Sequence, residues 1–121
     1  MTQSVTITDA RTTEPVTLIN AFTVPVEESE RFLDQWRDNA RIMARQPGMI
    51  RARMFRSLVD DAELRFVNVA EWESGTALDR ARANPEWRAS VQRLLDDPQL
   101  HITPRPVVYQ TAVDVHPADP L

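Results

Sequence analysis

The sequence predicts an α+β domain in which helices cover one face of a four-stranded antiparallel sheet. Four stretches combine apolar and β-branched residues with a period of two, which is typical of strands. Between the first and second of them, and again between the third and fourth, apolar residues recur every three or four positions, as in helices. A short polar turn at residues 60–61 joins the second and third strands as a hairpin. The resulting order, β-α-β-β-α-β, is that of the ferredoxin-like fold.

The first strand is predicted at residues 16–24, after a polar, threonine-rich arm at residues 1–14. Alternation puts Asn20 on the same face as its apolar neighbours Leu18 and Phe22. A proline at position 25 lacks the amide donor that a sheet needs, so the strand should end there.

A helix should then run from about residue 27 to about residue 46. Acidic residues mark its beginning, because negative charge is favourable at a helix N-terminus. Pro47 and Gly48 should end it. Its apolar stripe includes Phe32 and Trp36, so we interpret Trp36 first as core filling.

The second and third strands are predicted at residues 49–58 and 64–73. In the third strand, alternation places Asn68 and Trp72 on the same face as Phe66. A buried amide without a partner costs about 1–3 kcal/mol. Asn68 should therefore either have partners within the protein or face something that binds there.

The last third of the chain predicts a broken helical region and a final strand. Ser74 is a natural N-cap for a helix to about residue 83, and Asn-Pro-Glu at residues 84–86 begins a second helix. Residues 96–106 contain three prolines and predict a loop. The fourth strand is expected at residues 107–115.

The face of the sheet away from the helices is too apolar to lie in water. It carries Ile19, Ala21, Val67 and Val69. Because the helices can cover only one side, a second copy of the chain should cover the other. We therefore expect a homodimer with two-fold symmetry, in which two sheets pack face to face.

Composition excludes several classes of partner. At 121 residues the chain forms one domain, expected at residues 15–115 and followed by a tail at residues 116–121. A net charge of -4 argues against nucleic acid as a partner. No apolar run approaches the roughly 20 residues of a membrane span, and no leader opens the chain. We expect a cytoplasmic protein that does not bind membranes.

The residue types that are missing exclude several kinds of catalysis. The chain lacks lysine and cysteine, and its basic residues are 14 arginines. Schiff-base chemistry, thiol nucleophiles, disulfides and cysteine metal sites are thereby excluded. His101 and His116 belong to no Glu-x-x-His pattern and are interpreted as exposed loop residues. We expect no metal site and no histidine-based triad.

Three motifs carry a family resemblance: Leu-Ile-Asn-Ala-Phe-Thr-Val-Pro at residues 18–25, Gln-Pro-Gly at residues 46–48, and Arg-Phe-Val-Asn-Val-Ala-Glu-Trp-Glu-Ser at residues 65–74. Together with the helix around Trp36, they resemble the antibiotic biosynthesis monooxygenase family of dimeric α+β barrels, from residue 15 to about residue 109. The resemblance implies that an aromatic polyketide phenol or hydroquinone is oxidised to a quinone in a cleft between sheet and helices. It also implies O₂ as co-substrate and no cofactor.

The resemblance further implies three catalytic residues on the helix-facing side of the sheet. Asn68 and Trp72 match an asparagine and a tryptophan, four positions apart on the third strand, that line the cleft in the best-described members. Asn20 matches the first-strand asparagine of a haem-degrading branch. The two amides would hold a developing oxyanion, and Trp72 would offer a flat wall and an indole N–H.

Departures from the family pattern bear on the cofactor and the substrate. The haem-degrading branch has an iron-ligating histidine after the tryptophan, and residues 76–83 contain none, so haem is disfavoured. A tyrosine and a second-strand histidine of the quinone-forming members correspond to Leu78 and Phe55 here. An arginine of their site could be Arg88 or Arg93. The side chains expected to contact the substrate are Phe22, Trp36, Phe66, Leu78, Arg88 and Arg93.

Each assignment has a structural alternative: Asn68 could be a strand amide with protein partners, Asn20 could cap a turn, and Trp72 could belong to the core. A cofactor-free monooxygenase is the leading hypothesis. A polyketide cyclase comes second, and a non-catalytic dimeric protein that binds small ligands comes third. The cyclase would need an acid or base beside the cleft, and no helix-facing strand position offers a histidine or carboxylate. A non-catalytic protein would have a closed or featureless cavity.

Overall fold

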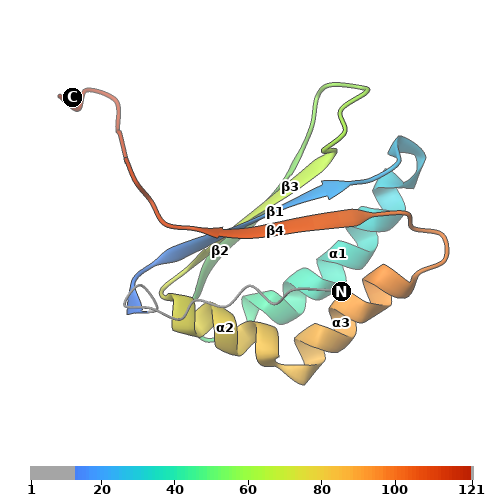
Figure 1. Ribbon diagram of the computed structural model, residues 1–121, viewed down its shortest axis with the longest axis horizontal. Helices are drawn as coiled ribbons and strands as arrows, with labels where there is room; N and C mark the ends of the chain where they lie inside the picture. Colours follow the sequence, from blue (N-terminus) through green and yellow to red (C-terminus); the bar gives the residue numbers. More distant parts are fainter. Residues whose placement is uncertain (1–12, 121) are drawn as a thin grey trace.

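A computed structural model describes residues 13–120 and confirms the predicted class and order of elements (Figure 1). A four-stranded antiparallel sheet carries the helices on one face, and no helix of the described residues covers the other. The expected arm at residues 1–14 lies almost wholly outside the described residues. The elements are β1 (Val16–Thr23), a 3₁₀ turn η2 (Val26–Glu28), α1 (Ser29–Ala44), β2 (Met49–Arg56), β3 (Phe66–Trp72), α2 (Gly75–Ala83), α3 (Pro85–Asp96) and β4 (Thr103–Tyr109).

The strands lie in the order β2-β3-β1-β4, so β3 and β1 form the centre of the sheet and β2 and β4 form its edges. The alternation predicted for the central strands is confirmed. Leu18 and Phe22 of β1, and Phe66 and Trp72 of β3, are buried beneath the helices. The intervening residues of both strands are half-buried on the open face.

β2 departs from its predicted alternation near its beginning. Its register with β3 shifts between Met49 and Arg51, so Ile50 is an extra residue that forms a bulge. Ile50 is consequently 57% exposed, whereas Met54 further along the strand is half-buried beneath the helices.

The prediction for the fourth strand is wrong in its bounds. β4 begins at Thr103 and ends at Tyr109, so it contains Pro104 and Pro106 and stops well before residue 115. An edge strand tolerates proline, because one side of it needs no amide donor. Pairing stops near the beginning of β1, with Thr17 opposite Tyr109. Beyond that point the chain runs away from the sheet (Figure 1).

The first helix begins about two residues later than predicted, because the acidic segment before it forms the turn η2. At its other end, Gly48 has the positive φ of 87° that favours glycine. A Cβ on Gly48 would also lie 2.5 Å from the Cβ of Ala77 in α2. Backbone conformation and packing therefore both require glycine at this position.

The N-caps predicted for α2 and α3 are confirmed. Ser74 Oγ accepts a hydrogen bond from the amide of Ala77 (3.1 Å), and Asn84 Oδ1 accepts one from the amide of Glu86 (2.8 Å). None of the helices within residues 13–120 has the length and apolar character that a membrane crossing requires.

The helix-facing core consists of two clusters of buried side chains. Trp36 is partly buried and packs against both of them. In cluster 2, the ring of Phe32 lies 5.0 Å from the rings of Phe22 and of Phe66, centroid to centroid. Cluster 1 contains Val16, Leu18, Ile42, Met43, Ala70, Trp72, Leu78, Ala81 and Trp87. Cluster 2 contains Phe22, Val24, Phe32, Phe66, Leu94 and Leu100.

Candidate functional site

One row of cross-strand neighbours, which contains two asparagines, crosses the sheet between the two core clusters. Asn20 of β1 is directly opposite Asn68 of β3, and Met54 of β2 and Pro106 of β4 complete the row on either side. The rows before and after it belong to clusters 1 and 2. The structure therefore brings the two predicted asparagines together, as a cross-strand pair at the centre of the helix-facing side.

Asn68 is buried without full hydrogen bonding. The residue is only 3% exposed, and its side-chain Oδ1 has no hydrogen-bond partner among residues 13–120. An unsatisfied buried acceptor costs about 1–3 kcal/mol. The structural alternative for Asn68 required protein partners for its carbonyl, and the described residues provide none.

Asn20 is in a different position, although it lies in the same row. Its Oδ1 accepts a hydrogen bond from the backbone amide of Arg105 in β4 (3.1 Å). The side chain thus links the central strand β1 to the edge strand β4. This hydrogen bond leaves the Nδ2 group of Asn20 as a donor for a ligand.

Trp72 is fully buried in cluster 1, where its ring lies 6.0 Å from that of Trp87, centroid to centroid. Its Nε1 donor has no partner among the described residues. Trp72 is four residues from Asn68 along the strand, which corresponds to about 13 Å. The two residues therefore share a face of β3 but are separated by the row that contains Ala70.

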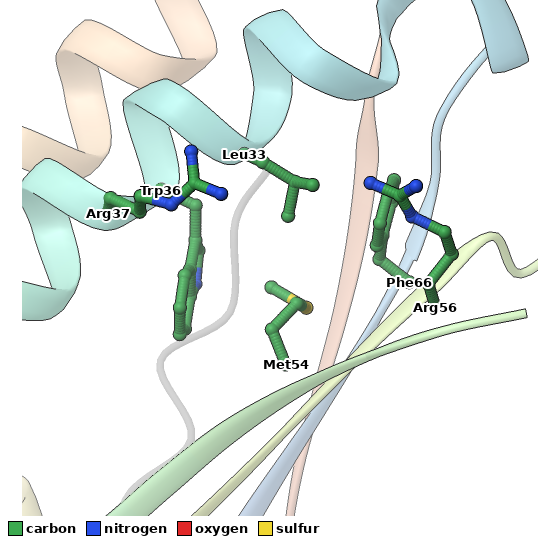
Figure 2. A pocket seen from close by; sticks show the side chains of 6 residues that line it. All are labelled: Leu33, Trp36, Arg37, Met54, Arg56 and Phe66. Atoms are coloured by element: carbon green, nitrogen blue, oxygen red, sulfur yellow. The ribbon is translucent and has the colours of Figure 1, made fainter.

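A pocket of about 270 Å³ opens between α1 and the β2–β3 side of the sheet. Figure 2 shows Trp36 reaching from the helix toward the sheet and Met54 rising from β2 to meet it. Because Met54 is directly opposite Asn68, the pocket ends one residue short of the unpaired amide. The lining residues are Leu33, Trp36, Arg37, Met54, Arg56 and Phe66.

Two arginines supply the charge of this pocket. Arg56 Nη2 lies 3.2 Å from Glu30 Oε2, and Arg37 Nη1 lies 2.8 Å from Asp34 Oδ1; both pairs are exposed to solvent. The guanidinium of Arg56 also lies 5.5 Å from the ring centroid of Phe66. Among the described residues, the lining of the pocket includes these two arginines and no carboxylate, and each arginine pairs with an acidic side chain beside the pocket.

The other predicted contact residues are distributed unevenly. Trp36 and Phe66 line the pocket, and Phe22 is next to them in cluster 2. Leu78 is fully buried in cluster 1. Arg88 and Arg93 are exposed residues of α3 and do not line this pocket. Phe55, at the position of the family histidine, is 47% exposed on the open face of the sheet.

Our sequence interpretation missed four of the residues that line the pocket, Leu33, Arg37, Met54 and Arg56, and the buried Asn39 of α1; two of these five carry a recognisable signal. Arg56 has the same parity as Met54 in β2, so alternation predicts that it faces the helices. Asn39 is a buried amide of α1 whose Oδ1 has no described partner. It is three residues after Trp36 on the apolar stripe of the helix. A polar residue on an apolar face, the signal that singled out Asn68, would have found both.

The two histidines and Asp97 lie outside the pocket. His101 Nδ1 is 2.7 Å from Glu28 Oε2, beside the turn η2, and His116 is in the C-terminal segment. Asp97, after α3, accepts hydrogen bonds from Arg31 (2.8 Å) and Gln35 (2.6 Å) of α1. The hydrogen bond from Arg31 is the largest influence that lowers the pKa of Asp97. Within residues 13–120, no three His, Asp or Glu side chains form a group that could hold a metal ion.

Comparison with known families is consistent with this architecture. The sequence model described as antibiotic biosynthesis monooxygenase matches residues 15–93. The chain belongs to this family. The match includes β1 with Asn20, β3 with Asn68 and Trp72, and all six residues that line the pocket.

Solved structures of the family are similar over most of their length. SnoaB, a cofactor-independent oxygenase from Streptomyces nogalater, is 31% identical, with a TM-score of 0.70 over 86% of this chain and 98% of SnoaB. A putative monooxygenase from Shewanella loihica PV-4 is 29% identical, with a TM-score of 0.65 over 84% of this chain and 97% of that one. Comparison with curated proteins gave no match.

The same fold also occurs in a protein that holds a porphyrin. A variant of MhuD with two manganese protoporphyrin IX molecules bound per active site has a TM-score of 0.65 and 23% identity, over 84% of this chain and 98% of that one. At this identity the likeness concerns the fold alone. The match to the sequence model establishes the monooxygenase family for this chain. Its substrate has to be inferred from the pocket.

Proposed function

We propose that this protein oxidises a small aromatic phenol or hydroquinone to a quinone with O₂, without a bound cofactor, in the cleft between α1 and the sheet. The observation that carries the proposal is the unpaired Oδ1 of Asn68, buried one residue from an apolar pocket with aromatic walls. Membership of a monooxygenase family and similarity to a cofactor-independent oxygenase support it.

The substrate supplies the electrons in this reaction. For an anthrone, the CH₂ carbon loses two hydrogens and gains one oxygen atom of O₂, so that it becomes a carbonyl. The second oxygen atom leaves as water together with those hydrogens. The protein must hold the phenol or phenolate and keep bulk water from the reacting carbon, which a bound ligand packed against the apolar side chains of the pocket would do.

Asn68 is the proposed catalytic residue closest to the pocket. Its Oδ1 would accept a hydrogen bond from the phenol, and a half-turn of the amide would present Nδ2 to the oxyanion that forms. Nδ2 of Asn20, directly opposite, would add a second donor. Trp72 would act from the neighbouring cluster through its unpaired Nε1.

The size of the pocket restricts the substrate to a compact molecule. Its volume of about 270 Å³ is just below the usual range of roughly 300–1,000 Å³ for small-molecule sites. Trp36 and Phe66 form aromatic walls suited to a planar ring system. Met54, between the pocket and Asn68, is a flexible side chain that can move aside as the ligand enters.

A polyketide cyclase is the less favoured reading of the same pocket. Ring closure would need a positioned acid or base, and the six lining residues provide two arginines and no carboxylate or histidine. A non-catalytic binding protein would take the same aromatic ligands without turning them over. Measured turnover therefore separates the three functions.

The experiment follows oxidation of a model anthrone by its absorbance, under air, with the reaction in buffer subtracted. We expect quinone formation well above that background. Asn68→Ala should lose roughly a hundredfold in rate, the usual effect of removing one oxyanion donor, and Trp72→Phe should also be slower. Gln92→Ala, which removes an exposed amide from α3, should match the parent. Quinone formation no faster than in buffer, or parental rates in both site variants, would refute the proposal.

We further propose that two copies of the chain pack through the open face of the sheet. Ile19 and Val69 are cross-strand neighbours there, and Val107, beside Ile19 on β4, is 43% exposed. An apolar surface continuous over three strands favours burial against a partner. The bare face lies opposite the helix layer that borders the pocket (Figure 1), so the dimer would leave the pocket accessible.

A further inference from the structure

We propose that the natural substrate carries a carboxylate, that Arg56 binds this group at the rim of the pocket with Arg37 adding positive charge from the other end, and that the aromatic body occupies the interior. The inference names the substrate class for the proposed oxidation and rests on that function for the reaction itself. The carboxylate site can be tested by binding alone.

The two arginines reach one pocket from opposite sides. Arg56 is the last residue of β2, and Arg37 lies in the middle of α1. Both line the same volume of about 270 Å³ (Figure 2). In Figure 2 the two guanidinium groups lie at opposite ends of the pocket, with Leu33 between them, so a carboxylate bound at Arg56 would experience Arg37 as a second, more distant positive charge.

The present partners of these arginines are easily exchanged. The carboxylate of Glu30, which pairs with Arg56, is 79% exposed, and that of Asp34, which pairs with Arg37, is 75% exposed. Ion pairs of this kind contribute little to stability, because both groups remain well solvated. A ligand carboxylate beside apolar walls would be less solvated and would be attracted more strongly.

The chemistry of the lining specifies an aromatic acid. A planar guanidinium offers two parallel N–H donors, which match the two oxygens of a carboxylate. The remaining lining side chains, Leu33, Trp36, Met54 and Phe66, offer apolar and aromatic contact. In this orientation the end of the ligand opposite the carboxylate points past Met54 toward Asn68. Binding at the rim would thus position the reacting ring.

The chain contains a matched control for the effect of charge. Arg41 lies one turn after Arg37 in α1 and pairs with Asp38 at the same i,i+3 spacing (2.6 Å). Its side chain is exposed and does not line the pocket. Arg41→Gln therefore removes the same charge and the same kind of ion pair, and leaves the proposed site intact.

The binding experiment uses an anthraquinone with one ring carboxylate, which cannot be oxidised further, and its methyl ester. Calorimetric titration should give at least tenfold tighter binding of the acid to the parent protein. Arg56→Gln should abolish this preference, Arg37→Gln should reduce it severalfold, and Arg41→Gln should retain it. The preference should also fall as salt is raised, because charge attraction at a rim is screened.

The kinetic experiment uses the corresponding pair of anthrones. The parent should have a lower KM for the carboxylated anthrone, and Arg56→Gln should raise that KM about tenfold and the KM of the ester much less, whereas Arg41→Gln should leave kcat and both KM values unchanged. Thermal unfolding of each variant checks that it is folded.

The outcomes separate this inference from the proposed function. Failure of the acid to bind, equal binding of acid and ester, or equal losses in Arg41→Gln and Arg56→Gln would overturn the carboxylate site, whether or not anthrones are oxidised. An acid preference that depends on Arg56, without quinone formation from any anthrone, would leave the carboxylate site standing and refute the oxidation.

Discussion

Asn20 and Asn68 lie directly opposite one another on neighbouring strands, and within residues 13–120 the side-chain carbonyl of Asn20 is hydrogen-bonded whereas that of Asn68 is not. The same residue type in one row thus does two different things. Asn20 attaches the edge strand through Arg105, and Asn68 keeps an unsatisfied acceptor next to a pocket. Stability and function should therefore respond differently to substitution at the two positions.

Asn20→Ala should lower the free energy of unfolding by about 1 kcal/mol, because it removes the hydrogen bond to the amide of Arg105. Asn68→Leu, of similar volume, should leave stability unchanged or raise it by about 1 kcal/mol, since it removes an unpaired buried acceptor. Urea denaturation of both variants measures these changes. A large loss in Asn68→Leu would mean that Asn68 stabilises the fold and would weaken its assignment to the site.

Gly48→Ala should destabilise the protein by about 1–3 kcal/mol, because the new Cβ would collide with Ala77 and the φ of 87° disfavours alanine. The matched background is Ala77→Gly, which removes the collision. In that background Gly48→Ala should lower the free energy of unfolding by less. The difference between the two decreases is the interaction energy of the pair. Equal losses in both backgrounds would show that the collision is relieved by movement of α2.

Asp97→Asn should make stability less dependent on pH on the acid side. Arg31 lowers the pKa of Asp97 in the folded protein, so the charged form contributes stability above the ordinary pKa of about 3.9. That contribution is lost as the pH falls through the lowered pKa. Urea midpoints of parent and variant should differ at pH 7 and converge toward pH 3. Asp38→Asn, which breaks an exposed pair with Arg41, is the control and should change little at any pH.

Ile19→Asp should convert the proposed dimer to a monomer, because it places a charge at the centre of the open face between Val69 and Val107. Light scattering after size-exclusion chromatography measures the mass. Val26→Asp is the control, since Val26 is 61% exposed in the turn η2, which precedes the first helix. A parent protein that is monomeric at micromolar concentration would contradict the proposal for this face.

Strand alternation predicted which face Asn20, Asn68 and Trp72 occupy, because a period of two leaves each residue only one side of the sheet. It could not predict hydrogen bonding. The partner of Asn20 is 85 residues away in the sequence, on a strand whose register depends on the whole fold. The unpaired state of Asn68 Oδ1 is likewise a property of the packed core.

The bounds of β4 illustrate a second difficulty. Val113 and Val115 continue an alternating pattern, but β1 begins at Val16 and offers no partner to residues beyond Tyr109, so both remain exposed. Pro104 and Pro106 suggested a loop, and only the position of β4 at the edge makes them tolerable. An alternating pattern predicts that a strand forms, whereas the length of that strand depends on the neighbouring strand with which it pairs.

Both edges of the sheet are poor templates for another strand. Two prolines interrupt the row of amide donors along β4, and β2 combines the bulge at Ile50 with the charges of Arg51 and Arg53. Edge-to-edge pairing, the usual route by which open sheets aggregate, is therefore blocked on both sides. The apolar open face is then the remaining surface of the sheet for self-association, which favours stacking of two sheets over growth into a fibre.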